Sequence, residues 1–145
     1  MPSSQRDDRA EIIAVLDGYA ECLDRREWER LDRVFADDVV FDFGEWRATT
    51  REEAVGAMRS YLDGCGPTQH LLGNYRIEID GDRATSKVYV RAFHIGVGAA
   101  EGRTYEMGGE YRDVLERRNG RWLSVSRVGE VFWELGFREV LGPAR

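Results

Sequence analysis

Residues 105–133, YEMGGEYRDVLERRNGRWLSVSRVGEVFW, decide the fold of this chain. The dipeptide Asn119-Gly120 is typical of a two-residue turn between antiparallel strands, because both turn positions take positive φ. It predicts one strand over residues 105–117 and another over residues 121–133. The pair Gly108-Gly109 indicates a bulge or bend within the first of them. The stretch therefore predicts a long antiparallel hairpin that is curved rather than flat.

Two more segments with strand character precede this hairpin. Residues 69–80 and 83–97 are separated by the turn sequence Asp80-Gly81-Asp82, and a glycine-rich stretch, 98–102, leads on to the hairpin. The second half of the chain therefore predicts a meander of four long antiparallel strands.

The first half of the chain has the spacing of helices instead. Apolar residues recur at three- and four-residue steps over residues 7–26, 28–35 and 51–62, and residues 39–43 resemble a short strand. Helices followed by a strand meander indicate the α+β class rather than alternating α/β. We expect a single domain over residues 1–145, a cone-shaped curved antiparallel sheet wrapped around the N-terminal helices, with an apolar interior that is a plausible ligand cavity.

The composition limits the partners of the protein. The chain has 145 residues, of which 42% are hydrophobic and 33% are charged, and a net charge of −6. An acidic balance disfavours nucleic acid, whose phosphates require a basic surface, and also an anionic membrane surface. No stretch has the apolar length of a membrane span, and residues 1–11 lack the apolar core of a secretory signal. We expect a cytoplasmic protein without nucleic-acid or membrane partners.

The sequence contains no recognisable metal or redox motif. Cys22 and Cys65 are isolated, so we expect two reduced thiols, with a disulfide between them as the alternative. Two histidines and an aspartate could bind a metal, but the HxH and HExxH spacings are missing. We therefore expect neither a metal nor a cofactor.

Three titratable side chains stand where the pattern favours apolar ones. Asp24, near the end of the first helix, projects within about 20° of Ile13 on the buried stripe. An acidic group is unfavourable at that end of the helix dipole, so Asp24 either leans into the core or caps the turn in water. His70 and His94 both fall in predicted strands, and each is either a satisfied core residue or a catalytic group.

Arg127 is a fourth misplaced side chain. Its neighbours on one face of the last strand, by strict alternation, are Leu123, Val125, Val131 and Trp133. A buried guanidinium without a partner costs several kcal/mol. We therefore expect either a substrate contact or a pair with a core carboxylate, such as Glu130 or Asp24 after a β-bulge.

Aromatic side chains supply material for the wall of a cavity. Most of them will be core residues, because large rings dominate core packing. The candidate substrate-binding residues are Tyr19, Phe43, Tyr111 and Trp133.

Several motifs occur in a characteristic order along the chain. They are residues 19–31 (YAECLDRREWERL), 35–39 (FADDV), 68–74 (TQHLLGN), 93–94 (FH), 108–111 (GGEY) and 116–122 (ERRNGRW). In these motifs the chain resembles the SnoaL-like family of the nuclear-transport-factor-2-like superfamily over nearly its whole length. The resemblance implies the cone-shaped fold.

Two enzymes of that superfamily match this sequence at functional positions. The resemblance to scytalone dehydratase implies a catalytic aspartate at Asp24 and histidines at His70 and His94. The resemblance to hexachlorocyclohexane dehydrochlorinase implies an aspartate–histidine dyad at Asp24 and His70 and an essential arginine at Arg127. These are the four residues that the pattern marks as misplaced.

The resemblance thus implies a metal-independent lyase or isomerase of the dehydratase or cyclase type, acting on a small hydroxylated aromatic or polyketide-like molecule. His70 would remove a proton from carbon, and Asp24 would fix the tautomer and stabilise the imidazolium. His94 or Arg127 would stabilise negative charge or protonate the leaving group.

Other functions stay open. The positions that hold two tyrosines in scytalone dehydratase are Leu23 and Phe43 here, which argues against that enzyme's own reaction. A non-catalytic binding or oligomerisation module of the same fold would use Trp122, Trp133 and Phe137 at an interface. Epoxide hydrolysis would require a second aspartate beside Arg127. In each case we expect a homodimer or homotrimer, because an open sheet tends to be covered by a neighbour.

Overall fold

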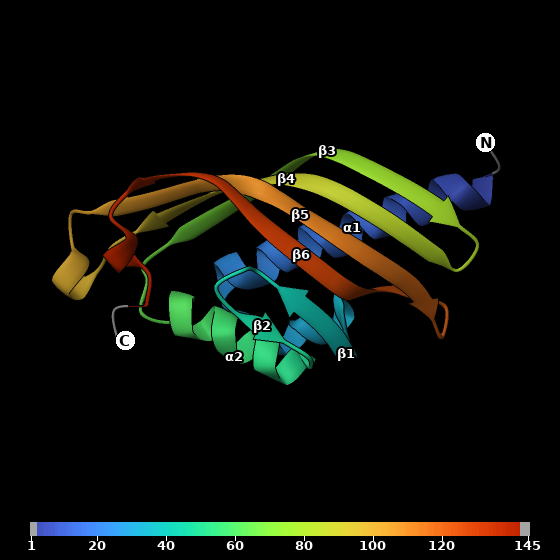
Figure 1. The fold of residues 1–145 in the computed structure, drawn as a ribbon, viewed down its shortest axis with the longest axis horizontal. Coiled ribbons are helices and arrows are strands. Elements are labelled where there is room, and N and C mark those ends of the chain that lie inside the picture. Colours follow the sequence, from blue (N-terminus) through green and yellow to red (C-terminus); the bar gives the residue numbers. More distant parts are fainter. Residues whose placement is uncertain (1–2, 143–145) are drawn as a thin grey trace.

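The computed structural model describes residues 3–142 and has the α+β architecture expected from the sequence (Figure 1). The two α-helices are α1 (Ser3–Arg25) and α2 (Arg51–Leu62), and the 3-10 helices are η1 (Trp28–Arg33), η2 (Gly98–Ala100) and η3 (Arg138–Val140). The strands are β1 (Phe35–Asp42), β2 (Arg47–Ala48), β3 (Thr68–Asp80), β4 (Arg83–Ile95), β5 (Thr104–Arg118) and β6 (Arg121–Gly136). The predicted class and the curvature of the sheet are confirmed.

All strands belong to one open sheet with the order β2-β1-β6-β5-β4-β3. Strands β3 to β6 form the predicted antiparallel meander, with the hairpin turn at Asn119 and Gly120, both of which have positive φ. Strand β1 differs from the expectation, because it pairs in parallel with β6. The sheet is therefore mixed rather than antiparallel throughout.

The boundaries of the first elements also differ from those expected. The segment expected to be helical over residues 28–35 is the 3-10 helix η1, and β1 already begins at Phe35, which pairs with Ser124 of β6. A register shift between Phe35 and Val40 accommodates the two aspartates that interrupt the apolar pattern. This irregularity keeps β1 paired with β6 at both ends.

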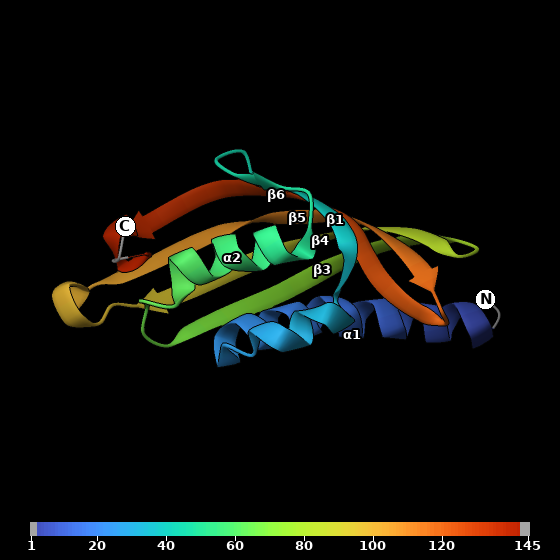
Figure 2. The same ribbon diagram turned by 90° about the horizontal axis from the view of Figure 1, so that it is seen from below.

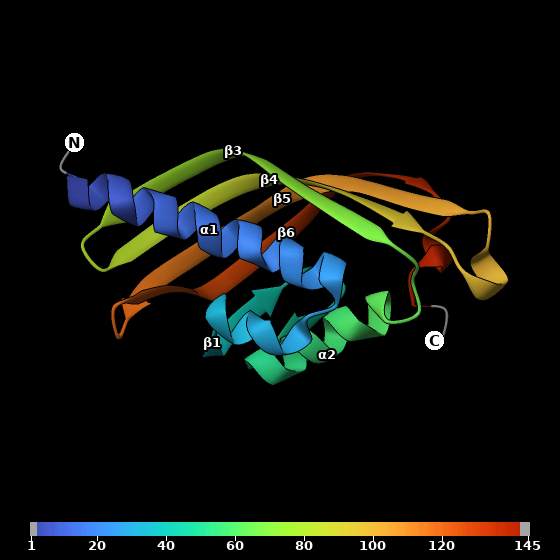
Figure 3. The same cartoon turned by 180° about the vertical axis from the view of Figure 1, so that it is seen from behind.

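The helices cover the concave side of the sheet. Helix α1 runs along β3 and crosses behind the other long strands, whereas α2 lies near β1 and β2 (Figures 1 and 3). The view from below shows α2 in front of the arched strands and α1 alongside β3 (Figure 2). None of the helices within residues 3–142 combines the length and apolar character that crossing a membrane requires.

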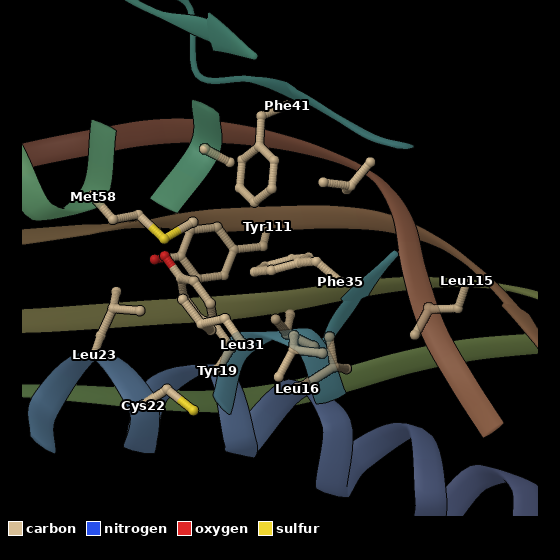
Figure 4. Packing of buried hydrophobic residues seen from close by; sticks show 14 of the residues in the cluster. Leu16, Tyr19, Cys22, Leu23, Leu31, Phe35, Phe41, Met58, Tyr111 and Leu115 are labelled. Atoms are coloured by element: carbon tan, nitrogen blue, oxygen red, sulfur yellow. The ribbon is translucent and has the colours of Figure 1, made fainter. Parts of the chain in front are cut away.

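An aromatic core fills the space between α1, β1 and β5 (Figure 4). Tyr19 makes edge-to-face contacts with Phe35 and Tyr111, at centroid distances of 5.6 and 5.5 Å, and Phe35 packs on Phe41 at 4.8 Å. Burial of each large apolar side chain stabilises the fold by about 1.5–3 kcal/mol. This core holds the C-terminal half of α1 against the sheet, which positions the residues described next.

Candidate active site

Asp24 and His70 form a close pair between the end of α1 and the start of β3. His70 Nδ1 lies 2.7 Å from Asp24 Oδ1, and the His70 backbone N–H donates to Oδ2 at 2.9 Å. An ionised carboxylate only accepts hydrogen bonds, so Nδ1 carries a proton, and in the neutral ring the lone pair lies on Nε2. The His70 side chain is only 6% exposed and Asp24 is 21% exposed. The structure thus brings together the two residues expected to form a dyad.

The surroundings keep Asp24 ionised. Burial raises the pKa of this carboxyl, but the hydrogen bonds from the side chain and backbone of His70 and from Thr68 outweigh it, and the pKa lies below its usual value. Thr68 Oγ1 donates to Asp24 Oδ1 at 2.9 Å. The sequence reasoning missed Thr68, although a period of two along β3 places it on the same face as His70.

Arg26 ties the end of α1 to the beginning of β3. Its guanidinium donates to Leu23 O at 2.6 Å, to Thr68 Oγ1 at 2.9 Å and to Gly66 O at 2.8 Å. Its own backbone has a φ of +56°, which is unusual for a residue with a side chain. Arg26 therefore fixes Thr68, which in turn fixes Asp24, and nothing in the sequence pattern pointed to it.

A cavity of about 380 Å³ opens beside the dyad. His70, His94, Leu23, Met58, Met107 and Tyr61 are among the side chains that line it, and they come from both α-helices and from β3, β4 and β5. Most of the wall is apolar, which strengthens charge interactions within the cavity. His70 therefore presents Nε2, its free ring nitrogen, on a largely apolar cavity.

His94 lines the same cavity but is arranged as an acceptor. It is 4% exposed, its ring lies 5.7 Å from that of His70, and its Nδ1 lies 2.9 Å from the carbonyl oxygen of Tyr105. The carbonyl requires the proton on Nδ1, which leaves a lone pair on Nε2. Burial lowers the pKa of His94 to about 4, so the ring is neutral near pH 7. This arrangement does not favour the expected role of His94 as a proton donor.

Arg127 lies behind the cavity wall, paired with Asp113. Its Nε and one terminal nitrogen donate to the two carboxylate oxygens at 2.8 and 3.0 Å, and both side chains are fully buried. Asp113 faces Arg127 directly across β5 and β6. The expected partners Glu130 and Asp24 were thus wrong. Asp113 is also the aspartate missing from the epoxide hydrolysis hypothesis, but neither it nor Arg127 lines the cavity.

Two tyrosines separate Arg127 from the cavity. The guanidinium carbon lies 4.2 Å from the ring centre of Tyr19 and 4.5 Å from that of Tyr111, and both rings line the cavity. Their hydroxyls are hydrogen-bonded to each other and point toward Met58 (Figure 4). Burial raises the pKa of both hydroxyls, so both stay protonated. One proton is used within the pair, and the other remains available to a second acceptor.

Of the four aromatic candidates, Tyr19, Phe43 and Tyr111 line the cavity and Trp133 does not. The Phe43 ring occupies the space that a Cβ on Gly129 would fill, and it stacks on Tyr111 at 5.9 Å.

Trp133 lies instead on the outer face of the sheet, where Arg91 packs 5.6 Å from its ring. Trp133 faces outward because β6 contains an extra residue, Phe132, at this point. Val131 pairs with Gly109 and Trp133 pairs with Gly108, so Phe132 has no partner on β5. This bulge reverses the alternation and turns Glu134 toward the cavity in place of Trp133.

Within residues 3–142, no three His, Cys, Asp or Glu side chains are grouped as ligands of a metal ion. Cys22 and Cys65 are both free thiols.

The fold and the site together define a class, the α+β cone with a histidine–carboxylate pair beside an apolar cavity. A profile of the SnoaL-like domain matches residues 4–128, and the chain therefore belongs to the SnoaL-like family. It is 35% identical over 83 residues to an uncharacterized protein of Mycobacterium bovis. The match covers 56% of each chain, so the sequence spans about half the length of the curated relatives it matches.

Solved structures share the fold over most of the chain. The protein Kfla4162 from Kribbella flavida superposes with a TM-score of 0.86 at 26% identity, covering 94% of this chain and 97% of that one. A type 2 hexachlorocyclohexane dehydrochlorinase has a TM-score of 0.82 at 20% identity, with coverages of 92% and 90%. A candidate scytalone dehydratase from Novosphingobium aromaticivorans has a TM-score of 0.82 at 19% identity, with coverages of 94% and 92%. The likeness to these two enzymes establishes the shared fold.

Proposed function

We propose that this protein is a cofactor-independent acid–base enzyme, a lyase or isomerase of the dehydratase or cyclase type, with His70 as its general base. The observation that carries the proposal is the 2.7 Å contact between His70 Nδ1 and Asp24 beside the cavity. The contact leaves Nε2 free to accept a proton from a bound molecule. An imidazole suits this task, because its ordinary pKa lies near physiological pH.

The first step is the removal of a proton from carbon. His70 Nε2 takes the proton, and the electron pair of the C–H bond forms a new double bond as the bond to the leaving oxygen breaks. Asp24 stabilises the imidazolium that forms, because it is ionised and hydrogen-bonded to the other ring nitrogen. The leaving oxygen then takes a proton, either from the imidazolium or from the paired hydroxyls of Tyr19 and Tyr111.

Arg127 contributes through the tyrosines rather than by touching the substrate. Its charge lies against the rings of Tyr19 and Tyr111, and it opposes the effect of burial on the pKa of both hydroxyls. Negative charge that develops on a substrate oxygen beside these hydroxyls would be stabilised by them and by the guanidinium behind them.

The substrate that fits this cavity best is a small hydroxylated aromatic or polyketide-like molecule. Aromatic walls such as Phe43, Tyr111 and Trp46 favour a planar ring, and a volume of about 380 Å³ suits one or two fused rings. A non-catalytic binding module would not require His70 and Asp24 to be in contact, so the close pair favours catalysis over that alternative.

The test uses a nitrobenzisoxazole, whose ring opens to a coloured phenolate when a buried base removes its C–H proton. We expect the wild type to accelerate this elimination and His70→Ala to lose about 10²–10⁴ of the rate, the usual contribution of general-base catalysis. Circular dichroism controls for folding. A wild-type rate no higher than that of a folded His70→Ala variant would exclude His70 as the base.

We also propose a cytoplasmic homodimer or homotrimer. Aromatic side chains stand exposed on the outer face of the sheet, away from both helices; they are Tyr89, Phe93, Phe132 and Trp133. A second copy would cover this face and protect it from water. Light scattering on the wild type and on Phe93→Ser tests the assembly, since a monomeric wild type would contradict it.

A further inference from the structure

The wall that carries the dyad continues to a carboxylate at the mouth of the cavity. We propose that Glu134, assisted by His94, binds a hydrogen-bond donor of the substrate, so that the enzyme accepts neutral or cationic molecules with a hydroxyl or amine and rejects carboxylates and phosphates. The inference rests on the proposed function only in taking this cavity as the substrate site.

Tyr105 holds both acceptors in place. Its hydroxyl donates to Glu134 Oε1 at 2.5 Å, its carbonyl oxygen lies 2.9 Å from His94 Nδ1, and its ring lies 5.2 Å from that of His94. Tyr105 is only 4% exposed, so its position is set by the core. One buried residue thus orients an imidazole and a carboxylate on the same wall.

Each of the two groups keeps an acceptor atom for a ligand. Within residues 3–142, Tyr105 is the hydrogen-bond partner of Glu134, which leaves Oε2 unused. His94 is nine-tenths buried, and its Nδ1 is occupied, so the lone pair on Nε2 is available to the cavity. Burial raises the pKa of Tyr105, with a further increase from Glu134, so the phenol stays a donor and Glu134 an acceptor.

The charged side chains around the cavity also favour neutral or cationic substrates. Among the described residues that line it, the carboxylates are Glu45, Glu130 and Glu134 and the cation is Arg138. The Arg138 guanidinium is already committed, because both of its terminal nitrogens contact the carboxylate of Glu45. Among the described residues, an anionic substrate would therefore meet no uncommitted cation in the cavity, whereas ammonium or hydroxyl groups would meet acceptors on Glu134 and His94.

An irregularity of the β6 backbone places Glu134 at the cavity. The bulge at Phe132 turns Glu134 inward. At this bulge β5 and β6 approach each other closely: a Cβ placed on Gly109 would lie only 2.1 Å from the carbonyl oxygen of Glu130. A residue larger than glycine at this position would displace the strand. The carboxylate therefore faces the cavity because of a specific backbone feature.

The experiment compares three phenols that differ in one group: tyramine, para-ethylphenol and para-hydroxyphenylacetate. Isothermal titration calorimetry at low salt measures their affinities for the full chain. We expect tyramine to bind more tightly than para-hydroxyphenylacetate by at least about tenfold, as for a hydrogen bond to a charged group, with para-ethylphenol between them. Glu134→Gln should remove most of this preference, and Tyr105→Phe part of it.

Glu139→Gln is the matched control, because it removes one negative charge from an exposed residue paired with Arg103 outside the cavity. It should leave the preference unchanged. Equal binding of tyramine and para-hydroxyphenylacetate, a preference that survives Glu134→Gln, or no binding of any probe would overturn the inference. His70→Ala should keep the preference for tyramine while losing turnover. The experiment therefore distinguishes an error in the assignment of the base from an error in the role proposed for Glu134.

Discussion

Two of the buried or partly buried carboxylate pairs, Asp113 with Arg127 and Asp24 with His70, differ in how accessible each is from the cavity. Asp113 and Arg127 are fully buried, and Arg127 donates two hydrogen bonds to Asp113. Asp24 and His70 are 21% and 6% exposed, and they share one side-chain contact. We refer to them as the sealed pair and the cavity pair.

The difference shows what a catalytic site requires of a charged pair. In the sealed pair, both carboxylate oxygens are used and aromatic rings cover the guanidinium, so no substrate can reach either group. In the cavity pair, the carboxylate is equally well held, but Nε2 of His70 has no hydrogen-bond partner among residues 3–142 and lies beside the cavity. One terminal nitrogen of Arg127 also lacks a hydrogen-bond partner, but it is buried. The difference between the pairs is therefore access: the sealed pair is closed to a substrate, whereas the cavity pair has one ring nitrogen that a substrate can reach.

The largest expected effect is on turnover by the cavity pair. Asp24→Asn replaces an acceptor-only carboxylate by an amide that can donate to Nδ1 and thereby stabilise the wrong tautomer of His70. We expect the rate of nitrobenzisoxazole opening to fall about 10²–10⁴-fold, close to the effect of His70→Ala. The control is Asp17→Asn, an α1 aspartate that contacts Tyr75 and not the dyad. An unchanged rate in Asp24→Asn would mean that the carboxylate does not assist His70.

The next largest effect is on stability, from the sealed pair. Asp113→Asn leaves the buried charge of Arg127 without a counter-ion, and we expect the free energy of unfolding in urea to fall by about 3–5 kcal/mol. Asp24→Asn should cost less, because its site is partly open to water.

A double variant distinguishes lost charge balance from lost shape. Asp113→Leu combined with Arg127→Met removes both charges and should recover much of the stability lost by Asp113→Asn. If the double variant is no more stable than the single one, the pair is required for packing rather than for charge neutralisation.

A third expectation concerns acid, to which the two pairs should respond differently. His94, beside the cavity pair, has its pKa lowered by burial from 6.5 to about 4. Between these values the unfolded chain binds a proton that the folded protein does not, so stability rises with pH across this window and is lost on acidification. The loss should approach about 3 kcal/mol near pH 4. Arg127, whose pKa is raised by Asp113, stays charged throughout.

Urea unfolding at several pH values measures this slope. His94→Gln keeps a polar side chain at the site but does not titrate, and it should flatten the curve between pH 4 and 6.5. A slope that is the same in both proteins would assign the acid sensitivity to another group.

Much of the fold was predictable from the sequence, because periodicity and turn residues act locally. The meander β3–β6 followed from two turn sequences and from runs with strand character. The parallel pairing of β1 with β6 was not predictable, because it joins segments far apart in the sequence and no local residue type signals it.

The site was predictable where misplaced polarity revealed it, and it was missed where the backbone is irregular. Asp24 and His70 stood out as polar, titratable side chains where the pattern favours apolar ones, and the structure brings them together. Trp133 was wrongly assigned to the cavity and Glu134 was missed, because the extra residue at Phe132 reverses the alternation on which both inferences depended. Asp113 was missed because cross-strand register decides its contact with Arg127.

The smallest expected effect comes from removing one hydroxyl beside each carboxylate. It compares the two pairs directly, because each carboxylate accepts a hydrogen bond from one hydroxyl. Thr68 Oγ1 donates to Asp24 at 2.9 Å and Ser124 Oγ to Asp113 at 2.8 Å. A hydrogen bond to a charged group contributes about 1.5–3 kcal/mol, which is the cost expected for removing either hydroxyl. Ser124→Ala should lower the free energy of unfolding by that amount and leave the rate of nitrobenzisoxazole opening unchanged. Thr68→Val should lower the rate by about tenfold with a smaller loss of stability, since Asp24 keeps its contact with water. If both variants changed rate and stability in the same proportion, the two hydroxyls would have the same role and the distinction between the two pairs would be lost.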